Sequence, residues 1–263
     1  MPYALDLSSR HALVCGASSG IGHATALCLA EAGATVTVLA RSADKLEAFC
    51  RELEAKGAKK AHALSADMDQ LVEFGRAVED HLDAHGPVHI CVHNTGGPPS
   101  GPILEKTEED MLAVFARHQL TAHFLVRLLL PGMKEAGFGR FVNILSTSAR
   151  EPIENLGLSN AIRAGMVGWA KTVANELPPG VTINNVLPGY TATERLTDLK
   201  NALSKRTGRS GDEVEAGWVD GIPEGRLGRP SEIGQAVLFL ASEMSSYVRG
   251  QSLAVEGGRL KGL

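Results

Sequence analysis

The chain has 263 residues, of which 44% are hydrophobic and 21% are charged, enough to build one large core. The formal net charge of −4 at pH 7 gives no reason to expect a nucleic acid or an acidic membrane surface as a partner. No charged segment followed by a long apolar one opens the chain, and no apolar run is long enough to cross a membrane. We therefore expect a cytoplasmic protein.

Short apolar or β-branched runs alternate with stretches of helical periodicity along the chain. The predicted strands are 11–16, 34–40, 61–67, 89–94, 138–146, 182–189 and 252–258. The predicted helices are 21–32, 42–56, one that ends near His85, 107–131, 155–177 and 231–242. Nearly continuous apolar strands in such alternation indicate a parallel sheet with helices on both faces. We predict a single Rossmann-like α/β domain over residues 1–263, a doubly wound parallel sheet in three layers.

Residues 191–228 interrupt this alternation, because they are polar, contain glycine and follow the carboxyl end of a strand. Ligands bind at that edge of open α/β sheets, so the segment could form a substrate flap. A simple surface insertion explains the pattern equally well.

The four cysteines lie far apart in apolar stretches and form no C-x-x-C pair; they are Cys15, Cys28, Cys50 and Cys91. This pattern indicates buried thiols rather than disulfides or a metal site, and we expect no bound metal.

A glycine-rich turn, Gly16-Ala17-Ser18-Ser19-Gly20-Ile21-Gly22, joins the first predicted strand to the first predicted helix. Glycine lets a diphosphate approach the helix amino end, where unpaired N–H groups and the helix dipole favour anions. The last glycine, Gly22, allows the helix to pack closely on the strand. This turn predicts a dinucleotide-binding site.

The end of the second predicted strand distinguishes between the two nicotinamide cofactors. Proteins that bind NAD usually place an acidic residue there to hold the ribose 2′-hydroxyl. This chain reads Leu39-Ala40-Arg41-Ser42 and has no acid. Because a guanidinium pairs with a 2′-phosphate, Arg41 favours NADP(H) over NAD(H).

The chain resembles the short-chain dehydrogenase/reductase family, in particular its 3-oxoacyl-(acyl carrier protein) reductase-like members. The resemblance covers nearly the whole chain. The segments that carry it are CGASSGIG, Asp67, HNTGG (93–97), NILS (143–146), NNVLPGYTAT (184–193), GRLGRPSEIGQAVLFLAS and GQSLAVEGG. Cys15 stands where the family usually has threonine.

The resemblance implies roles for residues along the cofactor. Asp67 would contact the adenine, Asn94 and Gly96 would line the cofactor, and Pro188-Gly189 would lie beside the nicotinamide. Thr193 would bind the carboxamide or the phosphates. The candidate cofactor-binding residues are therefore Gly16, Ser18, Ser19, Gly20, Ile21, Gly22, Arg41, Ser42, Asp67, Met68, Asn94, Gly96, Arg163, Pro188, Gly189, Thr191 and Thr193.

The family's chemistry usually needs Asn, Ser, Tyr and Lys, and this chain keeps only the serine. Ser146 matches the family serine, but the alignment places Ser159 at the tyrosine position and Arg163 at the lysine position. Gln119 falls at the asparagine position. The candidate catalytic residues are Ser146, Ser159, Arg163 and Gln119.

These replacements change the proton chemistry. The pKa of a phenol is ~10 and a nearby cation can lower it, whereas an aliphatic hydroxyl is a far weaker acid. We therefore do not expect Ser159 to replace the tyrosine, and Arg163 stays protonated and cannot relay a proton. We expect Tyr190 to pack against the flap, and a role as surrogate acid is the alternative. We expect His93 and His118 to lie on the surface of a strand or helix, and the alternative for each is a role in acid–base chemistry near the site.

A subset of the family shares the NTGGPP stretch and LSN-x-x-R in place of the tyrosine motif, and this sequence is similar to it. We predict an NADP(H)-dependent oxidoreductase acting on a carbonyl, alcohol or acyl-thioester substrate. Arg163 and Ser146 would polarise the substrate oxygen, and a water or a substrate group would supply the proton. The alternatives are a non-redox lyase or isomerase in the same pocket, or a dinucleotide-binding protein without catalysis.

Two long predicted helices carry apolar faces, and with the resemblance they lead us to expect a homotetramer or at least a homodimer. One face contains Met111, Val114, Phe115 and Leu125, and the other contains Met166, Trp169 and Val173. Packing within a single chain would also explain either face.

Overall fold

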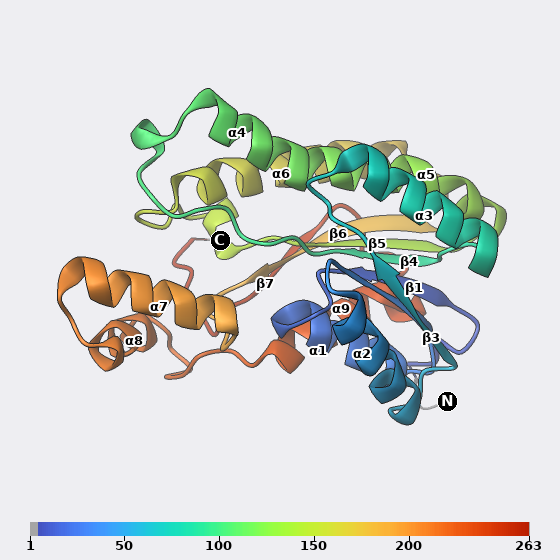
Figure 1. The fold of residues 1–263 in the computed structure, drawn as a ribbon, viewed down its shortest axis with the longest axis horizontal. Coiled ribbons are helices and arrows are strands. Elements are labelled where there is room, and N and C mark those ends of the chain that lie inside the picture. The colour runs from blue at the N-terminus through green and yellow to red at the C-terminus, as the bar shows by residue number, and fades with distance from the viewer. Residues whose placement is uncertain (1–4, 263) are drawn as a thin grey trace.

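The computed structural model describes residues 5–262 and contains one parallel sheet of seven strands (Figure 1). The strands are β1 (His11–Cys15), β2 (Thr35–Ala40), β3 (Lys60–Ser65), β4 (Ile90–His93), β5 (Gly139–Ile144), β6 (Val181–Pro188) and β7 (Ser252–Val255). Their order in the sheet is β3-β2-β1-β4-β5-β6-β7, and every neighbouring pair is parallel. The predicted doubly wound α/β fold is confirmed.

Helices cover both faces of the sheet and give three layers (Figure 1). On one face lie α1 (Gly20–Glu31), α2 (Ala43–Ala55) and α9 (Pro230–Ala241); on the other lie α3 (Leu71–His85), α5 (Thr121–Glu135) and α6 (Gly157–Glu176). The pleat of β1 divides the core between the two faces. Ala12 and Val14 pack with α1, α2 and α9, whereas Leu13 and Cys15 pack with α3, α5 and α6.

The predicted helix 107–131 differs from the structure in two ways. It consists of α4 (Glu108–Phe115), a π-helical segment (Ala116–Leu120) and α5, which continues past Pro131 to Glu135. Proline removes only one helical hydrogen bond, and the completely buried Met133 fixes the last turn to the core. The π-helical segment adds one residue to its turn and changes which side chains face inward after it.

Residues 191–228 are largely helical, which the sequence analysis did not predict. They contain α7 (Glu194–Thr207) and α8 (Gly211–Asp220), which project from one end of the sheet (Figure 1). Thr193 accepts a hydrogen bond from the Leu196 N–H, and Ser210 and Glu213 form a capping box. These caps start both helices although the sequence between them is polar.

The two apolar helix faces differ in exposure. Met166 is completely buried in the core, so packing within the chain accounts for the face on α6. On α4, Met111 and Phe115 are exposed, and so is their neighbour Leu112 at 68%. No helix within residues 5–262 is both long enough and apolar enough to cross a membrane.

Candidate active site

Two adjoining cavities open at the carboxyl end of the sheet, beside β1 and β4. At this point the chain changes direction across the sheet: β2 and β3 follow on one side of β1, and β4 to β7 follow on the other. The large cavity encloses about 470 Å³ and extends from the glycine turn to the end of β2. The small cavity encloses about 190 Å³ and lies between α6, α7 and the segment after β6. Six residues border both cavities: Ile21, Gly97, Leu145, Arg163, Thr193 and Arg195.

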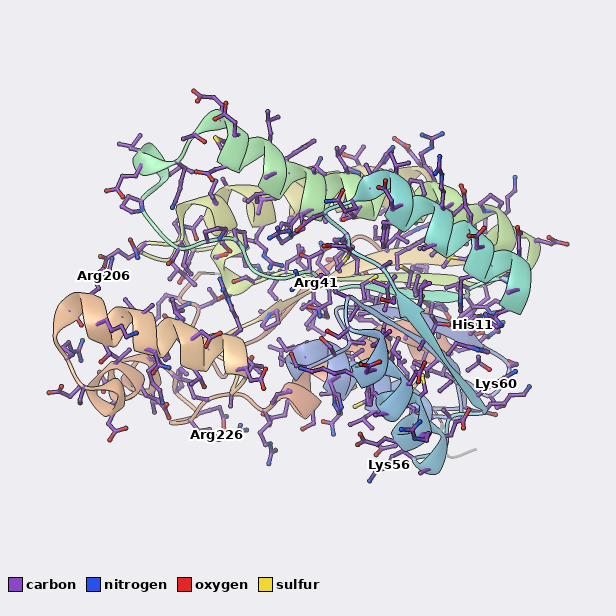
Figure 2. The ribbon with its side chains drawn as sticks, viewed as in Figure 1. His11, Arg41, Lys56, Lys60, Arg206 and Arg226 are labelled. Carbon is purple, nitrogen blue, oxygen red and sulfur yellow. The ribbon has the colours of Figure 1, made fainter. Side chains whose placement is uncertain are left out.

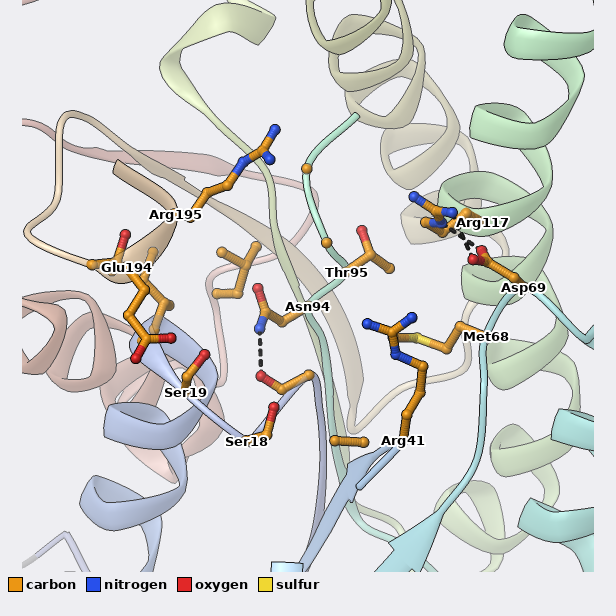
Figure 3. Close-up of a pocket in the computed structure, with 18 of the residues that line it drawn as sticks. Ser18, Ser19, Arg41, Met68, Asp69, Asn94, Thr95, Arg117, Glu194 and Arg195 are labelled. Carbon is orange, nitrogen blue, oxygen red and sulfur yellow. Dashed lines mark hydrogen bonds and ion pairs between the residues drawn. The ribbon is translucent and has the colours of Figure 1, made fainter. Parts of the chain in front are cut away.

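The glycine turn is held against β4 by an amide side chain. Asn94 Nδ2 donates hydrogen bonds to the carbonyl oxygens of Cys15 (3.3 Å) and Gly16 (3.2 Å), one of which is drawn in Figure 3. A Cβ on Gly22 would lie 2.2 Å from the Gly16 oxygen, so only glycine fits there. This close packing brings the start of α1 to the wall of the large cavity.

The amino end of α1 is ready to bind an anion. Ser19 is its N-cap residue but its side chain caps no N–H, and the first turn contains no acidic residue. Ser18, Ser19, Gly20 and Ile21 line the large cavity. The unpaired N–H groups and the helix dipole therefore face space that a diphosphate could fill.

Arg41 is exposed at the other end of the large cavity, at the carboxyl end of β2, and appears near the centre of the view in Figure 2. Asp67 and Met68 line the same end. The Asp67 carboxylate accepts a hydrogen bond from the Asp69 N–H (3.0 Å). Ser42 is the N-cap residue of α2 and lines neither cavity.

An ion pair that the sequence analysis missed closes this end. Arg117, from the π-helical segment, donates hydrogen bonds to both carboxylate oxygens of Asp69 (Figure 3). Its Nε lies 2.5 Å from Oδ1, and a terminal nitrogen lies 2.6 Å from Oδ2. Both side chains line the large cavity near Arg41. The two residues are 48 positions apart, so no local sequence pattern reveals their contact.

Ser146, Ser159 and Arg163 meet at the small cavity. Ser146 follows β5, and its hydroxyl oxygen accepts a hydrogen bond from the Ser148 N–H (3.1 Å), which leaves its proton available to a ligand. Ser159 and Arg163 are four residues apart on α6 and therefore share one face of the helix.

Arg163 is an almost completely buried cation, with 7% of its surface exposed. One terminal nitrogen donates to the Ile144 carbonyl oxygen at 2.6 Å, and Nε has no hydrogen-bond partner within the described part of the chain. Burial and the nearby Arg195 lower the pKa of the guanidinium to about 10, so it remains charged at neutral pH.

The inward-facing residue of the π-helical segment is His118, not Gln119. Gln119 lines neither cavity, and its Oε1 points towards Gly165. His118 is 1% exposed, and its Nδ1 shares a hydrogen bond of 2.6 Å with the Thr95 hydroxyl. Burial, and then the charge of Arg163, lower the pKa of His118 to about 2, so its imidazole is neutral.

The expectation that His93 and His118 lie on the surface is therefore wrong. His93 is 4% exposed, and its Nε2 shares a hydrogen bond of 3.0 Å with Thr121. Burial lowers the pKa of His93 to about 3. Both imidazoles lie near enough to Arg163 for its charge to lower their pKa values, and as neutral rings they add no further positive charge beside it.

The end of β6 and the segment after it form the opposite wall of the small cavity. Pro188, the last residue of β6, lines this wall with Gly189, Tyr190 and Thr191, and Thr193 borders both cavities. The Tyr190 ring stacks on Trp218 of α8, with ring centroids 5.0 Å apart. Tyr190 thus packs against the predicted flap, as expected from the sequence.

Comparison with known proteins identifies the family. The family model described as enoyl-(acyl carrier protein) reductase matches residues 16–259. The 3-oxoacyl-(acyl-carrier-protein) reductase FabG of Staphylococcus epidermidis is 33% identical over 254 residues, which are 95% of this chain and 98% of that protein. The chain belongs to the short-chain dehydrogenase/reductase family.

Solved structures of family members match the whole fold. The L-sorbose reductase of Gluconobacter frateurii, complexed with NADPH and L-sorbose, superposes with a TM-score of 0.92 at 28% identity, covering 99% of this chain and 100% of that one. A short-chain oxidoreductase of Pseudomonas aeruginosa PAO1, described as containing an atypical catalytic center, has a TM-score of 0.86 at 30% identity over 98% of this chain and 100% of that one.

Within this short-chain dehydrogenase/reductase, most of the candidate cofactor residues line one continuous space. Beyond the residues already described, Gly96 lines the large cavity, whereas Gly22 acts through packing. Sequence reasoning missed Thr95, Gly97, Glu194 and Arg195, which also line it. Arg195 follows the Thr193 cap by two residues and lies in the first turn of α7, a helix that the sequence pattern does not predict.

Proposed function

We propose that this chain is an NADPH-dependent reductase of carbonyl compounds in which Ser146, Ser159 and Arg163 hold the substrate oxygen. The observation that carries this proposal is the junction of the two cavities at Arg163, which places three hydrogen-bond donors beside the space for a nicotinamide. The family membership and the NADPH bound in the L-sorbose reductase relative support it.

The residues present fit the cofactor. The diphosphate would lie at the amino end of α1, which lacks any capping side chain or acid. Arg41 would pair with the 2′-phosphate, since neither it nor its neighbour Ser42 offers a carboxylate to a ribose hydroxyl. Pro188 and Thr193 would border the nicotinamide at the junction.

The chain's own groups would stabilise the charge that develops on the substrate oxygen. NADPH supplies the hydride when bound. The Ser146 and Ser159 hydroxyls and the Arg163 guanidinium line the same cavity and can donate hydrogen bonds to one oxygen; Ser159 and Arg163 are buried, which strengthens such bonds. Arg163 stays protonated, so a water in the small cavity would supply the proton.

We assign a small molecule as the substrate, a carbonyl, alcohol or acyl thioester. The negative net charge gives no support for nucleic acid as a partner. Four thiols without a disulfide in the described residues support a cytoplasmic location. The exposed Met111, Leu112 and Phe115 on α4 support a homodimer or homotetramer.

Isotope transfer tests this function. NADPH carrying deuterium at C4 would be incubated with the protein and a panel of simple ketones, oxo acids and 3-oxoacyl thioesters, and the products analysed by mass spectrometry. The proposal expects stereospecific deuterium transfer to at least one substrate and its loss in Ser146→Ala. Tight NADPH binding without transfer to any carbonyl would instead support the binding-only alternative.

A further inference from the structure

The small cavity has cationic side chains and no anionic ones. Arg163 and Arg195 line it, and among the described residues no aspartate or glutamate does. The rest of its wall is mainly hydroxyl groups and apolar side chains, the latter including Ile153, Leu156 and Leu199. A site for a neutral ketone or a sugar would need no such excess of positive charge.

The charge of Arg163 has no protein counter-ion. Within residues 5–262 it forms no ion pair, its single hydrogen bond goes to a neutral carbonyl, and its Nε has no partner. Arg195 also lacks an ion pair in that range and donates to the Pro98 carbonyl oxygen at 2.8 Å. A buried cation without a partner is costly, so the site favours a ligand that brings negative charge.

The reacting end of the cofactor does not provide this charge. The ribose beside the nicotinamide carries only neutral hydroxyls, and the ring is neutral when reduced and positive when oxidised. Hydride transfer would therefore add a third positive charge near the two guanidiniums. The diphosphate has its own donors at the amino end of α1.

We propose that the substrate is a short aliphatic oxo acid whose carboxylate pairs with the Arg195 fork, close to the charge of Arg163, while a terminal N–H group of Arg163 donates to the carbonyl oxygen. This inference rests on the proposed reductase function and narrows its substrate class. Arginine forks match carboxylate oxygens in geometry and charge. The alkyl part contacts Leu156, Leu196 and Leu199, and the volume of about 190 Å³ limits it to a few carbons.

The reaction balances without further reactants. The hydride passes from NADPH to the carbonyl carbon, the π electron pair of the C=O bond moves to oxygen, and oxygen takes one proton from water. The oxo acid, NADPH and one proton thus give the hydroxy acid and NADP⁺. The carboxylate is unchanged and serves only to position the carbonyl.

Matched acid and amide probes test the proposal, because they have the same shape and differ in charge. We expect kcat/KM for 3-oxobutanoate to exceed that for 3-oxobutanamide by about 10-fold or more, the scale of one charge-assisted contact. Calorimetry on the NADP⁺-loaded protein should show the same preference for butanoate over butanamide, and this readout does not depend on turnover.

Arg195→Gln should reduce the acid-to-amide ratio at least 5-fold in both measurements. Arg206→Gln is the matched control, since Arg206 is exposed at the far end of the same helix and lines neither cavity (Figure 2). It should leave the ratio unchanged.

Three results would overturn the proposal. Equal reduction of acid and amide would reject the substrate class while the reductase function stands. An Arg195→Gln variant that loses affinity for NADPH but keeps the acid preference would assign Arg195 to the diphosphate. No NADPH oxidation with any carbonyl, together with equal binding of butanoate and butanamide, would reject both the function and the class.

Discussion

Acid should weaken the fold through a cluster of histidines beside α3. The cluster consists of His11, His62, His81, His85 and His89. The Thr37 hydroxyl joins two of them, with Oγ1 2.7 Å from His11 Nε2 and 2.8 Å from His81 Nε2. A hydroxyl can donate to one imidazole and accept from the other, so the two rings share one polar contact. Burial and the closeness of the other histidines disfavour the charged forms of both rings.

The size of the effect follows from the pKa values. Burial, and then the neighbouring histidines, lower the pKa of His11 and of His81 to about 4. The unfolded chain titrates at ~6.5, so the contribution to stability is complete above that pH and is lost as the pH falls towards 4. At pH 5 the lowered pKa of each group, taken alone, would reduce the free energy of unfolding by about 2 kcal/mol. Because their mutual repulsion would be counted twice, we expect about 2–4 kcal/mol for the pair, a large part of the ~5–15 kcal/mol of a typical domain.

The charged groups around the cluster act unequally. Arg10 lowers the pKa of His89, and Lys60 lowers that of His62, whereas Glu54 raises the latter. The His89 Nδ1 accepts a hydrogen bond from the His11 backbone N–H at 3.1 Å, so protonation there would break a further contact. The net effect of the surroundings is to favour neutral histidines.

Urea unfolding followed by circular dichroism at pH 7.5, 6.5, 5.5 and 5.0 measures this dependence. His81→Gln keeps a side chain that can form a hydrogen bond to Thr37 but does not titrate. It should therefore remove about half of the decrease in unfolding free energy between pH 7.5 and pH 5. His123→Gln, an exposed histidine on α5, is the control and should leave the pH dependence unchanged. The reasoning is refuted if the wild-type unfolding free energy is the same at pH 7.5 and pH 5, or if His81→Gln does not flatten the curve.

Three further predictions concern the cofactor, the catalytic residues and the assembly. Arg41→Ala should weaken NADPH binding by roughly 1–3 kcal/mol and leave NADH nearly unaffected, and an equal loss for both in a titration would contradict the role of Arg41. Arg163→Lys should reduce cofactor or substrate binding, and the double change Ser159→Tyr with Arg163→Lys should gain little ketone reduction, because the tyrosine overfills the cavity and the lysine loses bidentate contacts. A large rise in NADPH oxidation by the double variant would show that the site is an ordinary reductase centre that lost its acid. Light scattering should give a dimer or tetramer, and a monomer at all concentrations would exclude both.

Local patterns predicted the parts of the site that one chain segment builds. The glycine turn and Arg41 each follow a strand directly, and a parallel sheet brings the carboxyl ends of its strands to one edge. Ser159 and Arg163 are one helical turn apart, so their shared face was readable as well. These inferences needed no knowledge of how distant segments pack.

Long-range packing determined what the sequence could not show. Whether His118 or Gln119 is buried depends on the π-helical segment, which shifts the inward face by one residue and has no reliable sequence signal. The Arg117–Asp69 pair and the approach of Arg195 to Arg163 join segments far apart in the chain. The charge of the small cavity therefore became apparent only in the structure.

A crystal structure with NADP⁺ bound tests the central claim most directly. The account predicts that the 2′-phosphate pairs with Arg41, the diphosphate lies at the amino end of α1, and the nicotinamide C4 faces the small cavity beside Ser146 and Arg163. A nicotinamide that lies outside the junction of the two cavities, or whose C4 faces a different set of side chains, would contradict it.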